Sequence, residues 1–227
     1  MLEIECVGER LQLLPEKAIY WKRASTLIVA DLHFGKPAAF RQSGIAVPEN
    51  TTTEDLARLE NILSRTRSER LVILGDFLHA SSGLQPEMLD AVEAWRKKRS
   101  QLSILLIRGN HDKRAGNPPQ NWGIEVLPGG EQDEPFVFCH EPEESSEGYV
   151  LCGHIHPAIA LGEKFGGGIR APCFCFGKRC AILPAFGSFT GMRNIHPRQG
   201  DRAFAVGPEE IIEVTSRFSS SRKARAP

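Results

Sequence analysis

The chain has 227 residues, of which 41% are hydrophobic and 25% charged, and its 28 basic residues balance 28 acidic ones. This length suits a single domain with one core, and the apolar content excludes an intrinsically disordered protein. A formal net charge of zero excludes a general attraction to nucleic acid or anionic membranes, so any polyanion site must be local. No apolar run approaches the roughly 18 residues that span a bilayer, and the charged N-terminus lacks the apolar region of a signal peptide. We therefore expect a cytoplasmic protein with no membrane contact.

Three short apolar runs in the first half predict buried strands, at Thr26–Ala30, Leu71–Leu74 and Ile104–Ile107. They are rich in β-branched residues and continuous rather than alternating, which is typical of strands buried on both faces. Two stretches with helical periodicity lie between them, Thr53–Leu63 and Pro86–Lys98. One of Thr51, Thr52 and Thr53 is a candidate N-cap of the first helix. The order β-α-β-α-β indicates an α/β sheet with helices against it.

The second half predicts further strands but no convincing helix. The candidates are Pro135–Cys139, Tyr149–Cys152, Ile169–Cys175, Cys180–Leu183, Ala203–Val206 and Ile211–Val214. We expect an antiparallel sheet there, packed against the first sheet in a layered sandwich with helices outside. The tail from 216 to 227 is rich in Ser and Arg and lacks apolar periodicity, so we expect one domain over residues 1–215 followed by a disordered tail.

Residues of metal-ligand type follow the predicted strands. Their clusters are Asp31-Leu32-His33, Gly75-Asp76-Phe77-Leu78-His79, Gly109-Asn110-His111-Asp112, His140 and Gly153-His154-Ile155-His156. Ligands of open α/β sheets bind outside the carboxyl ends of the strands, so these clusters can share one site. Six of the seven histidines belong to this set, and only His196 stands apart. Any one of them alone is more simply a structural histidine, but the full set favours a metal centre.

Two divalent cations about 3.5 to 4 Å apart need a shared anionic ligand, which a carboxylate such as Asp76 can supply. Imidazole, carboxylate and amide ligands suit Mn, Fe or Zn. The glycines that precede the ligands, Gly75, Gly109 and Gly153, allow a close approach of the backbone. The six cysteines do not form a disulfide framework in a chain of this length, and the spacing of Cys173, Cys175 and Cys180 does not match a zinc knuckle, so we interpret them as reduced thiols.

This motif set, D-x-H, G-D-x-x-H, G-N-H-D, an isolated His and G-H-x-H, strongly resembles the calcineurin-like metallophosphoesterases. The resemblance implies a four-layer αββα sandwich with two mixed sheets. It implies that Asp31, His33, Asp76 and His156 hold one metal and that Asp76, Asn110, His140 and His154 hold the other. It further implies a metal-bridging hydroxide as the nucleophile, His111 as the general acid, and Asp112 as the residue that orients the His111 ring. His79 stands where many members carry Asp, and we expect it to hydrogen-bond the metal ligands or to bind substrate.

Other segments are similar to the ligase-associated DNA damage response endonucleases of the PdeM family. They are Thr26–Lys36, Phe40-Arg41, Gly44–Pro48, Leu74–His79, His140–Pro142, Leu183–Gly187 and Thr190-Gly191, within a similarity over about residues 8–214. This resemblance implies a bacterial, Mn-dependent phosphodiesterase with DNA endonuclease activity. It also implies a functional association with a DNA ligase, a helicase and an exonuclease in DNA repair.

Two alternatives to a DNA endonuclease remain open. The same metal cage hydrolyses many esters, so the substrate could be a nucleotide or another small phosphoester. A non-catalytic scaffold is the second alternative, but every expected ligand and His111 are present. Basic residues near the motifs, Lys36 and Arg41 among them, are candidates for substrate binding, although a chain with 28 basic residues places some near any site by chance.

Overall fold

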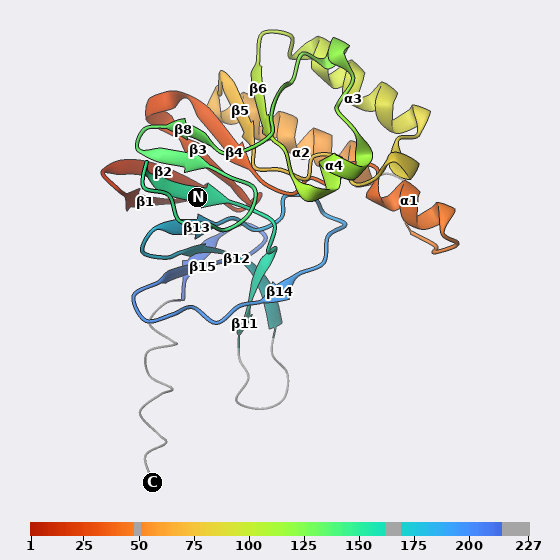
Figure 1. Ribbon diagram of the computed structural model, residues 1–227. Coiled ribbons are helices and arrows are strands. Elements are labelled where there is room, and N and C mark those ends of the chain that lie inside the picture. Colours follow the sequence, from red (N-terminus) through yellow and green to blue (C-terminus); the bar gives the residue numbers. More distant parts are fainter. Residues whose placement is uncertain (48–50, 162–168, 215–227) are drawn as a thin grey trace.

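The computed structural model describes residues 1–47, 51–161 and 169–214, and the predicted tail lies outside them. Two mixed β-sheets pack face to face, and the helices gather against one of them (Figure 1). The expected single α/β domain with two mixed sheets is therefore confirmed. No helix in the described part of the chain is long and apolar enough to cross a membrane.

The first sheet has seven strands in the order of the sequence. They are β1 (Leu2–Cys6), β2 (Glu9–Leu14), β3 (Ala18–Trp21), β4 (Thr26–Val29), β5 (Arg70–Ile73), β6 (Ser103–Ile107) and β7 (Glu125–Leu127). The first four are antiparallel, and β4 to β7 are parallel. The three predicted strands became β4, β5 and β6. β1 to β3 were not predicted, because β1 and β2 carry charged residues among their apolar ones and β3 is only four residues long.

Four α-helices precede residue 116 in the described chain. They are α1 (Lys36–Gln42), α2 (Thr51–Thr66), α3 (Pro86–Lys98) and α4 (Asn110–Ala115), with 3-10 turns η1 (Lys22–Ala24), η2 (Ser81–Gly83) and η3 (Gln120–Trp122). The two predicted helices are confirmed as α2 and α3, which bury their apolar stripes on the first sheet. The threonines proposed as N-cap lie inside α2, which begins at Thr51, so the cap position falls outside the described residues.

The second sheet is mixed, as the family resemblance implied, and the antiparallel sheet expected from the strand pattern alone was wrong. Its strands are β8 (Glu131–Asp133), β9 (Phe136–Phe138), β10 (Tyr149–Cys152), β11 (Pro157–Leu161), β12 (Ile169–Phe176), β13 (Cys180–Ile182), β14 (Arg193–Asn194), β15 (Arg202–Val206) and β16 (Ile211–Glu213). β10 lies between β9 and β13 and is parallel to both. Such pairing depends on contacts between distant segments, which strand patterns do not reveal.

In the described part of the chain, helices cover one outer face of the sandwich. Aromatic and aliphatic residues of both sheets fill the space between them, including Trp21, Phe136, Phe138, Phe174 and Phe204. Within residues 1–47, 51–161 and 169–214 no helix packs on the outer face of the second sheet, so the fourth layer of the expected αββα sandwich is not formed there.

Candidate metal centre

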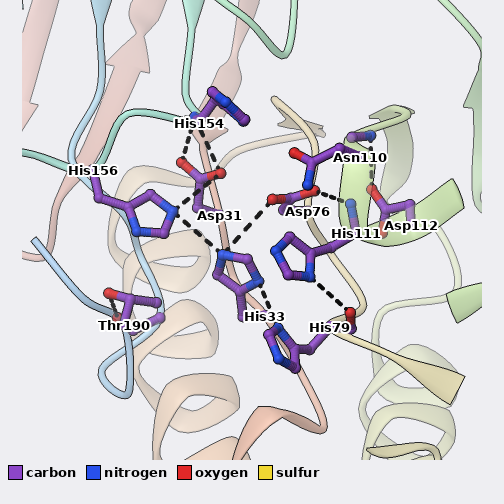
Figure 2. Close-up of polar contacts among 12 residues, drawn as sticks. Asp31, His33, Asp76, His79, Asn110, His111, Asp112, His154, His156 and Thr190 are labelled. Atoms are coloured by element: carbon purple, nitrogen blue, oxygen red, sulfur yellow. Dashed lines mark hydrogen bonds and ion pairs between the residues drawn. The ribbon is translucent and has the colours of Figure 1, made fainter. Parts of the chain in front are cut away.

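The predicted ligands meet where strands from both sheets end. Asp31 and His33 follow β4, Asp76 follows β5, and Asn110 begins α4 just after β6. From the second sheet, His140 follows β9, and His154 and His156 follow β10. Figure 2 shows that side chains from these separate segments point toward one another.

Asp31, His33 and His156 form one group, whose ligand atoms all lie within 4.8 Å of one another. His33 Nε2 is 3.3 Å from His156 Nε2, and His156 Nε2 is 3.6 Å from Asp31 Oδ1. Asp31 is fully buried and accepts hydrogen bonds from the His154 backbone amide. Such a convergence of nitrogen and oxygen lone pairs could hold one divalent cation.

A second group contains Asp76, His140 and His154. His140 Nε2 lies 3.1 Å from His154 Nδ1 and 3.0 Å from the Asn110 side-chain oxygen. The other nitrogen of the His140 ring, Nδ1, donates to the Leu74 carbonyl at 2.9 Å. That hydrogen bond fixes the tautomer, so Nε2 presents its lone pair to the cluster.

Asp76 belongs to the second group and also faces His33 of the first group, to which an ion pair joins it in Figure 2. Its Oδ1 is 3.5 Å from His140 Nε2, and its Oδ2 is 3.8 Å from His33 Nε2. The two carboxylate oxygens therefore face different groups of imidazoles. This is the arrangement that a carboxylate shared by two cations requires.

Five of the candidate ligands hold a left-handed backbone conformation. Asp31, His33, Asp76, His154 and His156 have φ angles between 51° and 69°. Non-glycine residues adopt this region at a cost of roughly 1–2 kcal/mol each. Strain of this kind persists where the surrounding structure imposes it, and it is concentrated at functional sites.

Two of the glycines that precede candidate ligands bring backbone segments against the carboxylates of Asp76 and Asp31. A Cβ atom on Gly109 would lie 2.2 Å from Asp76 Oδ1, and one on Gly153 would lie 2.6 Å from Asp31 Oδ2. Real Cβ atoms do not approach other atoms so closely, so only glycine fits at either position. Both glycines therefore allow the backbone to pass close to a candidate ligand carboxylate.

The electrostatics of the cluster fit bound cations. Burial lowers the pKa of His33 to about 2, which keeps the ring neutral and its lone pair available. Burial also raises the pKa of Asp76, and the neighbouring Asp31 adds to this effect, although His140 and the His111 amide oppose it. The ion pairs that the structure shows for Asp31 and Asp76 are with imidazoles. Divalent cations would supply the positive charge that two adjacent buried carboxylates need.

His79 and His111 stand beside the first group. Their rings stack with centroids 4.5 Å apart, and His79 Nδ1 lies 3.3 Å from His33 Nδ1. His111 Nδ1 is 2.9 Å from the His79 carbonyl oxygen, to which it donates, and the His111 amide donates to Asp76 Oδ1 at 2.8 Å. His111 is therefore positioned by its contacts with both His79 and Asp76.

The comparisons with known proteins agree with this geometry. A family model described as calcineurin-like phosphoesterase matches residues 24–163, more than half of the chain. This chain is a calcineurin-like metallophosphoesterase. The crystal structure of Pseudomonas putida nuclease MPE matches with a TM-score of 0.82 and 41% sequence identity, covering 93% of this chain and 99% of that one.

Two more distant structures also match this metallophosphoesterase. A protein of unknown function from Aquifex aeolicus has 15% identity and a TM-score of 0.41, covering 61% of this chain and 81% of its own. The phosphoesterase Yfce from E. coli has 14% identity and a TM-score of 0.40, covering 84% and 98%. These two carry no argument here. A search of curated proteins gave no significant match.

One role predicted for this metallophosphoesterase needs correction. Asp112 does not contact the His111 ring, because its Oδ1 accepts the Leu78 amide at 2.8 Å and its Oδ2 accepts the Gly109 amide at 2.9 Å. The residue is buried and caps α4. The ring of His111 is held instead by the His79 carbonyl. A side-chain motif gives no signal for this contact, since its acceptor belongs to the backbone.

The two basic candidates for substrate binding, Lys36 and Arg41, lie in different surroundings in the metallophosphoesterase. Lys36 is half-buried next to the cluster, where burial lowers its pKa while Asp76 and Asp31 raise it. Arg41 lines a cavity of about 490 Å³ with residues of α2 and α3, among them Thr52 and Met88.

His196 is exposed and belongs to none of the ligand groups, as predicted. The six cysteines are free thiols, and five of them are buried.

The segment from Leu183 to Gly191 contributes through its backbone to the metallophosphoesterase site. The Phe186 and Gly187 amides donate to the Ala30 and Asp31 carbonyls at 2.7 and 3.1 Å, and His156 Nδ1 donates to the Gly191 carbonyl at 3.1 Å. This segment therefore holds two candidate ligands in place. Sequence analysis noted it only as part of a family resemblance, because backbone contacts leave no residue signature.

Proposed function

We propose that this metallophosphoesterase is a Mn-dependent phosphodiesterase that cleaves DNA. The observation that carries the proposal is the 41% identity and 0.82 TM-score to Pseudomonas putida nuclease MPE over nearly the whole length of both chains. A likeness of this extent favours a shared substrate class over the fold alone. The donor set of imidazole, carboxylate and amide groups suits manganese, with Fe or Zn as the other candidates.

Two cations would be held by Asp76 and the six other candidate ligands around it. Asp31, His33 and His156 would hold the first, and Asn110, His140 and His154 the second, with one oxygen of Asp76 directed to each. When bound, the cations would supply Lewis acidity, which activates water and polarises the phosphoryl group. The left-handed backbone of five of these ligands and the close packing at Gly109 and Gly153 restrict the positions that the donor atoms can take.

His111 is the proposed general acid. Because Nδ1 donates to the His79 carbonyl, Nε2 is the nitrogen that can pass a proton to the departing alcohol oxygen. The stacked ring of His79 limits rotation of His111. We assign His79 this supporting part, in agreement with its contacts to both His33 and His111.

A cation and two aromatic rings border the centre on the side of α1. The Lys36 ammonium lies 5.8 Å from the Phe40 ring centroid, where it could meet a phosphate oxygen. The half-buried Phe40 packs edge-to-face on Phe189 with centroids 5.5 Å apart, and its ring is 6.2 Å from that of His79. Aromatic rings beside a cation can stack on bases of single-stranded DNA. These features support a nucleic-acid substrate.

The cellular setting remains part of the proposal. The PdeM-like segments favour a role in DNA repair in the cytoplasm, in functional association with a DNA ligase, a helicase and an exonuclease. We assign the catalytic domain to residues 1–215 and treat 216–227 as a tail.

The deciding experiment compares substrates with the purified, Mn-loaded protein. We expect cleavage of supercoiled plasmid and of single-stranded DNA, together with hydrolysis of a small chromogenic phosphodiester. Asp76→Asn protein prepared in parallel controls for contaminating nucleases. Hydrolysis of the small diester with both DNA substrates left intact would reject the nuclease and favour a small phosphoester as substrate. No hydrolysis of any ester, with metal bound, would favour the scaffold.

A further inference from the structure

A cavity of about 220 Å³ adjoins the metal centre at His156. Its lining joins the turn between β2 and β3, the start of β11, the middle of β12 and the segment after β13. The lining residues are Lys17, His156, Pro157, Pro172, Ala185, Ser188, Thr190 and Met192. Thr190 lies below His156 in Figure 2, and both residues line the cavity. The cavity is therefore next to the candidate ligand group formed by Asp31, His33 and His156.

Lys17 gives this cavity a positive charge. Its ammonium donates to the Gly187 carbonyl at 3.3 Å, which directs the side chain toward the segment that carries Ser188 and Thr190. Burial lowers the pKa of Lys17 to about 8, Arg58 contributes to the decrease, and Asp55 opposes it. A desolvated ammonium is stabilised when an anion comes within contact distance.

The neighbouring carboxylate does not neutralise Lys17. Asp55 Oδ1 is 2.9 Å from Arg58 Nη2, and Asp55 Oδ2 accepts the Ser188 amide at 3.0 Å. Lys17, Arg58 and Asp55 together carry one net positive charge, which remains at the base of the cavity. Glu16, the next acid along the chain, pairs with Arg65 at 2.8 Å.

The fold holds Lys17 in this place at some cost. The residue has φ 67° in the turn after β2, and its amide donates to the Leu14 carbonyl at 2.9 Å. A non-glycine residue adopts the left-handed region against steric strain, and burial of its charge adds to that cost. A half-buried cation kept under strain next to a candidate active site points to a binding role.

We propose that this cavity binds a phosphate of the DNA strand that neighbours the phosphodiester being cleaved, with Lys17 as the cation that contacts it. This inference rests on the proposed function as a DNA phosphodiesterase. The lining favours a phosphate over a base, since it offers an ammonium and the hydroxyl-bearing Ser188 and Thr190, and its one aromatic ring is that of the candidate metal ligand His156. A substrate with a single phosphate cannot use the site.

The test measures how strongly the enzyme prefers a substrate with flanking phosphates. Rates of wild type, Lys17→Met and Lys17→Arg are compared on a short single-stranded oligonucleotide and on a chromogenic diester with one phosphate. Lys22→Met is the matched control, because Lys22 is exposed at the other end of β3. A hydrogen bond to a charged group contributes about 1.5–3 kcal/mol. We therefore expect the ratio of kcat/KM values, oligonucleotide over diester, to fall about tenfold or more in Lys17→Met, mainly through KM.

Salt dependence provides a readout that a merely structural role would not change. Each phosphate contact on a single strand contributes about 0.7 to the slope of log affinity against log salt. Lys17→Met should lower the slope for the oligonucleotide by about that amount, while Lys17→Arg and Lys22→Met should keep it.

Several outcomes would overturn the inference. Equal losses on both substrates would mean that Lys17 only supports the Gly187 segment, and an unchanged ratio and slope would mean that no flanking phosphate binds there. Wild-type protein that hydrolyses the diester but not the oligonucleotide would reject the proposed function itself, and the inference with it. If wild-type protein cleaves both the oligonucleotide and the diester, the proposed function stands, and the Lys17 variants alone test the inference.

Discussion

Gly109 offers a sharp test of the metal centre, because it tests the position of Asp76 without changing any ligand. In Gly109→Ala the new Cβ would lie 2.2 Å from Asp76 Oδ1 and 2.4 Å from the Asp76 backbone nitrogen. Ordinary contact begins at 3.4 Å, so the carboxylate oxygen would have to retreat by about 1.2 Å. The backbone of Asp76 has little freedom to move, since its carbonyl accepts the His33 amide at 2.8 Å.

The expected loss of activity follows from this displacement of the Asp76 carboxylate. A misplacement of about 1 Å in a catalytic arrangement can lower the rate about 100-fold, and we expect a loss of that order in kcat for Gly109→Ala. Overpacking typically destabilises by about 1–3 kcal/mol. In a chain of this size, each kcal/mol lowers the Tm by roughly 2–4 °C, so the variant should remain folded.

The assay combines steady-state hydrolysis of the chromogenic diester, metal content by elemental analysis and thermal unfolding. Gly129→Ala is the control, because a Cβ at Gly129 meets nothing within 4 Å. Near-normal kcat and full metal content in Gly109→Ala would show that the position of Asp76 is not critical, and the shared-carboxylate argument would then fail.

Three other substitutions test the shared carboxylate, the general acid and the charge of Lys17. Asp76→Asn should lower activity by orders of magnitude and reduce the metal content below two ions per chain, and a near-normal rate with two ions bound would contradict the bridging role. His111→Ala should sharply lower turnover of esters with poor leaving groups but leave metal content unchanged, with His196→Ala as the matched control; equal rates for the two variants would remove His111 as general acid. Lys17→Met should have a higher Tm than wild type at pH 7. The lowered pKa of Lys17, about 8 against an ordinary 10.5, means that the unfolded chain binds more protons between these values, so wild-type stability rises with pH and the gap should close toward pH 10. Calorimetry from pH 7 to 10 measures this gap, and a wild type that is the more stable at pH 7 would contradict the reasoning.

The sequence by itself determined the parts of the fold that depend on local pattern. The continuous apolar runs at β4, β5 and β6 can only be buried on both faces, and α2 and α3 carry apolar stripes at helical spacing. Because parallel strands end at the same edge of a sheet, residues such as Asp31 and Asp76 had to meet once those strands were assigned. The candidate ligands could therefore be predicted from their positions after the strands in the sequence.

Only the tertiary structure decided the features that join distant segments through the backbone. Parallel pairing of β10 with β9 and β13, the His79 carbonyl as the partner of His111, and the cap that Asp112 provides depend on contacts that no periodicity encodes. The cavity at Lys17 is the clearest case, because it joins that residue with His156 and Thr190 from far along the chain. Side-chain type can be read from the sequence, but the partner of a backbone group and the place of a buried charge are set by packing.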